Sequence, residues 1–190
     1  MHRGSFRFAC VGAVIAASSI TVSSCGGSEK STTLEVEGLR VDLINDALDE
    51  LHTTGADTFG YFEVNATSRV VNLFVATDLD GAPNGDGKPD AVAQYVYLPT
   101  GELQGPAEPL GANGPTFTMD EVDFVADSVL DTVLAELPTS TPSMFVITSA
   151  GSADVESDRV EYRVTLLSEY GGELSVLVSA SGEVIGTDAD

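Results

Sequence analysis

Two stretches of this chain carry the same order of secondary-structure signals, a helix followed by three strands. In the first stretch a helix is predicted over residues 39–52, because its apolar residues recur at helical spacing, and Gly55 suits its end. These apolar residues are Leu43, Ile44, Ala47, Leu48 and Leu51. Strand patterns follow at residues 61–66, 70–77 and 91–98. This order of elements limits the chain to folds in which helices pack on a sheet.

The second stretch begins with a stronger helix signal. Thr118 and Glu121 have the spacing of a capping box, in which a hydroxyl and a carboxylate each satisfy a free backbone N–H. Apolar residues keep helical spacing from Val122 to Leu137, and Pro138 then ends the helix. Strands are predicted at residues 144–148, 159–167 and 174–179, and the middle one alternates strictly between apolar and polar side chains. Such alternation indicates a sheet with one face in the core.

We therefore expect an α+β fold of two tandem α-β-β-β units, with an antiparallel sheet and the helices on one face. The first unit is predicted over residues 36–111 and the second over residues 112–190. Whether the units share one sheet stays open at this point. The closing sequence Ser-Ala-Ser-Gly-Glu-Val-Ile-Gly resembles that of PepSY-like domains, and the tandem pattern resembles the β-lactamase-inhibitor-protein architecture. These resemblances imply a periplasmic or extracellular binding or inhibitory module.

A thirteen-residue acidic segment, residues 78–90, joins two of the predicted strands. Calcium takes six to eight oxygen ligands, and closely spaced carboxylates with intervening glycines can supply them. The segment resembles the calcium loops of thrombospondin type 3 and FG-GAP repeats, which implies calcium as a ligand. The predicted metal ligands are Asp78, Asp80, Asn84, Asp86 and Asp90. A solvated turn without an ion is the alternative, since Gly, Asp and Asn are common turn residues.

The first 24 residues have the pattern of a targeting segment, a basic start followed by an apolar run too short to span a membrane. The sequence Val22-Ser23-Ser24-Cys25 resembles a bacterial lipobox, which implies that Cys25 carries lipid and becomes the first mature residue. Residues 25–35 are predicted to form a flexible tether. We expect a lipid-anchored protein at the extracytoplasmic face of the cell membrane or the outer membrane.

The charge of the chain limits its partners. The formal net charge is −22, and without residues 1–24 six basic residues stand against 30 acidic ones, a formal charge of −24. This balance argues against binding to nucleic acid and favours cations or basic partners. Adaptation to a salty habitat explains the same acidity.

No set of residues predicts an enzyme. His52 is the only histidine after the targeting segment, there is no Gly-x-Ser-x-Gly sequence, and no His/Cys cluster has zinc spacing. We therefore expect a non-enzymatic lipoprotein that binds a protein or peptide, with a calcium-binding acidic loop. Two alternatives stay open. One is a metal-assisted hydrolase that uses the aspartates of residues 78–90, and the other is a salt-adapted structural protein of the envelope.

Overall fold

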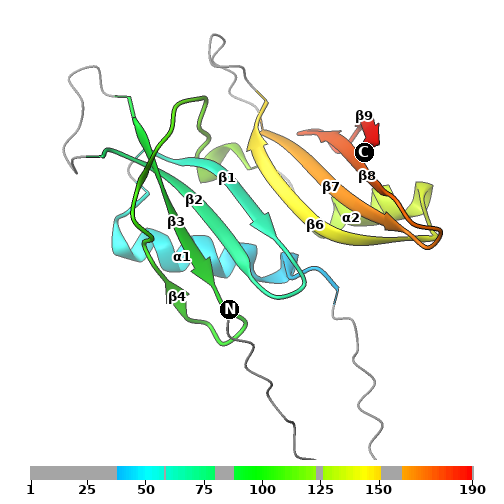
Figure 1. The fold of residues 1–190 in the computed structure, drawn as a ribbon, viewed down its shortest axis with the longest axis horizontal. Helices are drawn as coiled ribbons and strands as arrows, with labels where there is room; N and C mark the ends of the chain where they lie inside the picture. The colour runs from blue at the N-terminus through cyan, green and yellow to red at the C-terminus, as the bar shows by residue number, and fades with distance from the viewer. Residues whose placement is uncertain (1–37, 58, 80–87, 123–125, 151–159, 190) are drawn as a thin grey trace, which may run out of the picture. The chain divides into compact units, whose positions relative to one another are not determined.

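All strands of the described chain belong to one antiparallel sheet. The computed structural model describes residues 38–57, 59–79, 88–122, 126–150 and 160–189. The sheet has nine strands in the order β4-β3-β2-β1-β6-β7-β8-β9, and β5 pairs with β3 at one end (Figure 1). The strands are β1 (Tyr61–Ala66), β2 (Val71–Thr77), β3 (Ala91–Tyr97), β4 (Leu103–Gln104), β5 (Leu110–Gly111), β6 (Ser140–Ser149), β7 (Val160–Ser168), β8 (Glu173–Ser179) and β9 (Val184–Ala189).

The expected α+β class is confirmed, and the open question about the sheet has an answer. Strand β1 pairs with β6, with Ala66 opposite Phe145 and Glu63 opposite Thr148, so both halves share one sheet. The structure adds a strand at each end that the strand patterns did not predict, the short β4 and the six-residue β9. The tether and targeting segment lie outside the described residues.

Two helices accompany the sheet in the described part of the chain, and each comes after a short 3-10 turn in the sequence. Helix α1 (Ile44–Thr54) follows the 3-10 turn Val41–Leu43 and ends at Gly55, whose φ of 71° permits the left-handed C-cap. Helix α2 is described over Ala126–Glu136, within the predicted range, and residues 123–125 lie outside the described residues. The predicted capping box is present, but it caps the 3-10 turn Met119–Glu121.

The hydrophobic core lies between the helices and one face of the sheet. Strand β7 shows how alternation in the sequence forms the core-facing side of the sheet. The apolar residues of its alternating pattern are all at most 1% exposed. They are Val160, Tyr162, Val164 and Leu166. From the helices, Ala47, Leu48, Leu51, Val129 and Val133 join the same cluster. At the middle of the sheet the rings of Phe145 and Tyr162 lie 5.8 Å apart between centroids.

A β-bulge at Phe62 changes the phase of strand β1. Glu63 pairs with Phe74, but Tyr61 pairs with Val75, so one extra residue lies between the two pairs. In a regularly paired strand Tyr61 would share a face with Glu63, because residues two apart lie on the same side of the sheet. With the bulge, Tyr61 turns into the core, 1% exposed, and lies 5.8 Å from Phe117 between ring centroids.

We predict that Gly60→Ala destabilises the protein by about 2–3 kcal/mol, and Gly55→Ala by only about 1 kcal/mol. Both glycines have positive φ, 83° and 71°. A Cβ at Gly60 would meet the backbone oxygen of Phe117 at 2.5 Å, whereas a Cβ at Gly55 meets nothing within 4 Å. Urea unfolding of the two variants measures the difference. Equal losses would contradict a close backbone approach at Gly60.

Candidate functional site: the uncovered face of the sheet

The sheet has one face that no described helix covers. Helix α1 contacts β2, helix α2 contacts β7, and both helices lie behind the sheet in the view of Figure 1. The cross-strand register gives the composition of the opposite face. One row runs Val96, Asn72, Asn65, Val146, Arg163 and Leu177 from β3 to β8. The next row runs Gln94, Phe74, Glu63, Thr148, Glu161 and Ser179. We call this side of the sheet the uncovered face.

A chain of side-chain hydrogen bonds crosses three strands of the uncovered face. Asn65 Nδ2 donates to Glu63 Oε1 at 2.6 Å within β1, and Asn72 Nδ2 on β2 donates to Asn65 Oδ1 at 2.7 Å. Gln94 Nε2 on β3 then donates to Asn72 Oδ1 at 3.1 Å. We call Glu63, Asn65, Asn72 and Gln94 the amide ladder. Side-chain networks of this kind order the groups that form them, because each member restricts the rotamer of the next.

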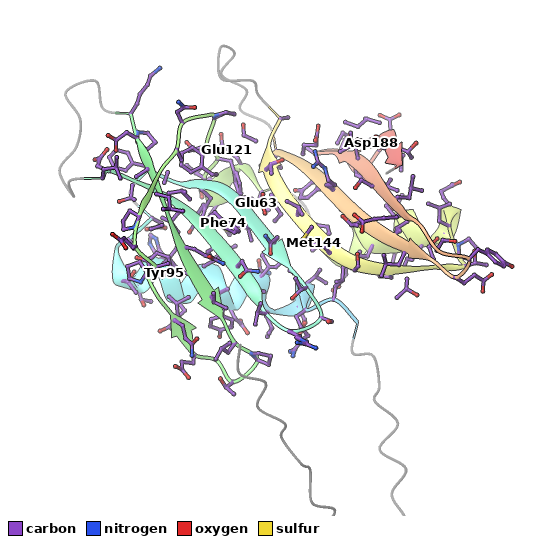
Figure 2. The ribbon with its side chains drawn as sticks, viewed as in Figure 1. Glu63, Phe74, Tyr95, Glu121, Met144 and Asp188 are labelled. Carbon is purple, nitrogen blue, oxygen red and sulfur yellow. The ribbon has the colours of Figure 1, made fainter. Side chains whose placement is uncertain are left out.

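The centre of the uncovered face is shielded from solvent although no described helix lies on it. Asn65 is 7% exposed, Val146 is 6% exposed and Thr165 is 4% exposed. Half-buried apolar side chains lie around them, among them Phe74 on β2 and Met144 on β6, both labelled in Figure 2. Hydrogen bonds in such surroundings are stronger than in water, and unpaired polar groups are costlier.

Phe74 lies between the two ends of the amide ladder. It lies directly opposite Glu63 on β1 and directly opposite Gln94 on β3. The two ends of the amide ladder therefore flank one aromatic ring in a single cross-strand row. Adjacent strands are about 5 Å apart, so the two flanking residues are about 10 Å apart across the ring.

The amide ladder was not among the sites predicted from the sequence. The signal was nevertheless present, because Glu63 and Asn65 alternate with apolar residues on one strand, and Asn72 and Gln94 do so on the next two. Alternation predicts that these four polar residues share the face away from the core. Only the strand register places them within hydrogen-bond distance of one another.

The structure describes two of the five predicted metal ligands. Asp78 follows β2 and is 5% exposed, and its Oδ1 is buried without a hydrogen-bond partner among the described residues. Asp90 precedes β3, and its Oδ1 accepts a hydrogen bond of 2.8 Å from the backbone N–H of Leu79. Asp80, Asn84 and Asp86 lie outside the described residues. Within the described ranges, no group of three or more His, Cys, Asp or Glu side chains has metal-binding geometry.

His52 takes part in a hydrogen-bonded group that links two elements. His52 Nδ1 and Asp57 Oδ2 are 2.9 Å apart, and the hydroxyl of Tyr61 donates to the same oxygen at 3.4 Å. The hydrogen bond with Asp57 raises the pKa of His52, and the negative charges of Asp57 and Asp49 add to this effect. Burial, with the nearby Asp57 carboxylate, raises the pKa of Tyr61 strongly. This arrangement joins the end of α1 to the start of β1.

We predict that the free energy of unfolding falls as the pH rises through the folded-state pKa of His52. Because this pKa lies above its ordinary value of 6.5, protonated His52 contributes stability fully below pH 6.5 and loses it above the folded-state pKa. The change is small, since the imidazole is 79% exposed. Urea unfolding across this pH window should give a steeper curve for the natural protein than for His52→Gln. Parallel curves would contradict the prediction.

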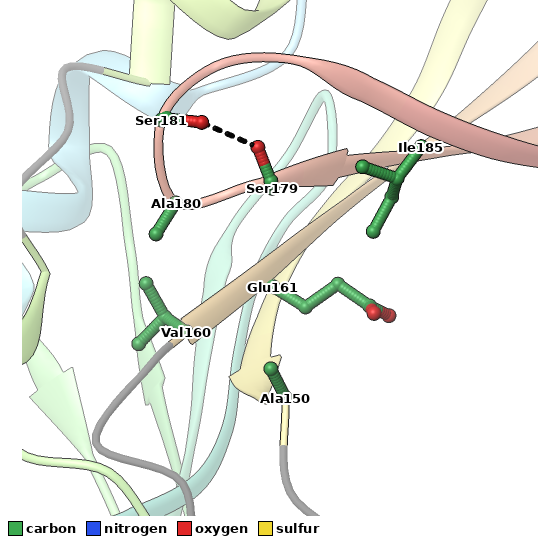
Figure 3. Close-up of a pocket in the computed structure, with 7 residues that line it drawn as sticks. All are labelled: Ala150, Val160, Glu161, Ser179, Ala180, Ser181 and Ile185. Atoms are coloured by element: carbon green, nitrogen blue, oxygen red, sulfur yellow. Dashed lines mark hydrogen bonds between the residues drawn. The ribbon is translucent and has the colours of Figure 1, made fainter.

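A surface cavity of about 540 Å³ lies beside the start of β7, the end of β8 and the start of β9 (Figure 3). Its described lining residues are Ala150, Val160, Glu161, Ser179, Ala180, Ser181 and Ile185. Ser179 Oγ and Ser181 Oγ lie 2.9 Å apart, so each hydroxyl already has a polar partner. Glu161 is the charged member of this described lining. We therefore give the amide ladder precedence over this cavity as the functional site.

Comparison of the chain with protein-family models, with curated proteins and with solved structures finds no match. No helix within the described ranges is long and apolar enough to cross a membrane. Cys25, the predicted lipidation site, lies outside the described residues.

Proposed function

We infer that this protein is a non-enzymatic lipoprotein, anchored through Cys25 to the extracytoplasmic face of a membrane, and that it binds a protein or peptide on its uncovered face. The observation that carries this proposal is the combination on that face of an ordered amide ladder with apolar side chains. Protein interfaces have this composition, an apolar and aromatic centre with a small number of fixed polar groups.

The shielding of the centre supports the same proposal. Asn65, at the centre of the ladder, is 7% exposed, so little water competes with its hydrogen bonds to Glu63 and Asn72. Side chains held by neighbouring hydrogen bonds also lose little conformational freedom on binding, which favours affinity. The lipid on Cys25 and the tether of residues 25–35 would present this face to partners outside the cytoplasm.

We further propose that calcium binds the acidic loop of residues 78–90. Asp78 supports this proposal, since its buried Oδ1 has no hydrogen-bond partner among the described residues and a cation would compensate it. Asp90 lies at the other end of the loop and is held by Leu79. Bound calcium would connect the ends of β2 and β3, the strands that carry Phe74 and Gln94.

We predict that calcium raises the melting temperature of the full chain at fixed ionic strength. A ligand at about 100 times its dissociation constant adds about 2.7 kcal/mol of stability. Asp78→Asn should abolish the shift, and Asp46→Asn, the same change at an exposed position of α1, should retain it. An equal melting-temperature shift with magnesium, or an undiminished calcium shift in Asp78→Asn, would contradict a calcium site and indicate a solvated turn.

Photocrosslinking tests partner binding in the cells that produce the protein. A photoreactive phenylalanine analogue at Phe74 places the probe on the uncovered face, and the same analogue at Glu50 places it on the exposed side of α1. The proposal predicts a discrete adduct from Phe74 and none from Glu50. Adducts from Glu50 alone, or from neither position, would contradict binding at the uncovered face.

A further inference from the structure

The glutamate at one end of the amide ladder determines the direction of every bond in it. An ionised carboxylate accepts hydrogen bonds and cannot donate them, so Asn65 must present its NH₂ group to Glu63. The carbonyl oxygen of Asn65 then faces Asn72, which must present its own NH₂ group. The same constraint passes to Gln94, whose NH₂ group faces Asn72. The ladder therefore has one orientation.

This orientation leaves acceptors at both ends. At one end is the second carboxylate oxygen of Glu63, and at the other is the carbonyl oxygen of Gln94. Because aligned hydrogen bonds polarise one another, the charge of Glu63 strengthens the acceptor character of Gln94. Both acceptors flank Phe74 in one cross-strand row. An aromatic face between two acceptors is complementary to a planar cation with several donors.

The charge of the uncovered face favours the same ligand. Its described strand residues include four acids, Glu63, Glu161, Glu173 and Asp188, and one base, Arg163. The whole chain has a formal net charge of −22. A field of this sign attracts basic partners and repels acidic ones.

We propose that the uncovered face accepts an arginine side chain of a partner protein, with the guanidinium stacked on Phe74 between the acceptors of Glu63 and Gln94. Arginine fits better than lysine, because its guanidinium is planar, stacks on aromatic rings and carries five N–H donors in a fixed arrangement. This inference rests on the proposed function and names the chemistry of the partner. The half-buried surroundings of Phe74 strengthen both the stacking and the hydrogen bonds.

Three mixtures of labelled heptapeptides test the inference against the full chain by fluorescence polarisation. Six positions are randomised, and the centre is arginine, its uncharged isostere citrulline, or glutamate. The arginine mixture should bind on the order of tenfold more tightly than the citrulline mixture, and the glutamate mixture most weakly. Glu63→Gln and Phe74→Leu should each bring the arginine-to-citrulline ratio close to one.

Glu50→Gln is the matched control, because it removes the same charge from α1 without touching the ladder, and it should preserve the ratio. A ratio of one in the natural protein, or equal losses in Glu63→Gln and Glu50→Gln, overturns the inference. So does self-association of the chain that Phe74→Leu abolishes, because a second copy would then occupy the face. A discrete photoadduct at Phe74 combined with an arginine-to-citrulline ratio of one would overturn the inference and leave the proposed function intact.

Discussion

Phe145→Ala is expected to lower the free energy of unfolding by about 3–5 kcal/mol. Phe145 is fully buried on β6, the strand that joins the two halves of the sheet, and its ring packs against Tyr162. Removing it leaves a cavity at this junction, where neighbours on both sides are held in register and cannot collapse freely. A typical domain has only about 5–15 kcal/mol of stability, so the loss is a large part of the total.

Phe74→Ala is the matched control, since it removes the same side chain from the uncovered face. Phe74 is half-buried, so less apolar surface returns to water, and we expect a loss of about 1–2 kcal/mol. Urea unfolding of both variants gives the comparison. Losses of equal size would contradict the assignment of Phe145 to the core and of Phe74 to the uncovered face.

Asn65→Asp is expected to cost about 2–4 kcal/mol at pH 7, although it changes one NH₂ group to an oxygen. In the natural protein Asn65 Nδ2 lies 2.6 Å from Glu63 Oε1, and the residue is 7% exposed. The substitution places two carboxylates side by side with little water to screen them. It also removes the NH₂ donor that links Glu63 to the rest of the amide ladder.

The loss should depend on pH with a definite sign. The new carboxyl group has a folded-state pKa above its unfolded value of about 3.9, because its neighbour disfavours a second negative charge. The cost is therefore absent well below pH 4 and grows as the pH rises to the folded-state pKa. Asn113→Asp, at an exposed position between β5 and Phe117, is the control and should cost little at either pH. A deficit of the same size at pH 4 and pH 7 would show that repulsion is not its cause.

The fold class could be predicted from the spacing of apolar residues in the sequence. The strand pairings that form the candidate site could not. Strict alternation in β7 predicted the burial of its apolar residues but not that of Thr165, which is 4% exposed, and the helical spacing in both helices predicted their core sides. Strand β9 was missed because Val184 to Ala189 has no clean alternation, and a bulge interrupts its pairing with β8. The bulge at Phe62 was missed for the same reason, since an extra residue leaves no signal in a single sequence.

The candidate site shows the same limit more clearly. The aspartates of residues 78–90 could be predicted as a site because they are close together in the sequence. A motif of nearby residues is recognisable without a structure. The amide ladder joins residues from three strands. Glu63 and Gln94 are separated in the sequence by the β1–β2 and β2–β3 connections. Contacts of this kind depend on register, and a shift of one residue would move these side chains to the opposite face.

A nuclear magnetic resonance titration of the full isotope-labelled chain with the arginine-centred peptide mixture tests the central claim most directly. It observes the side-chain amides of Asn65, Asn72 and Gln94 individually, and it maps every other group that the peptides affect. Binding on the uncovered face predicts that these three amide signals shift together, with smaller changes along α1 and α2. Shifts confined to the helices, or no shifts at all, would contradict the assignment of the uncovered face as the binding surface.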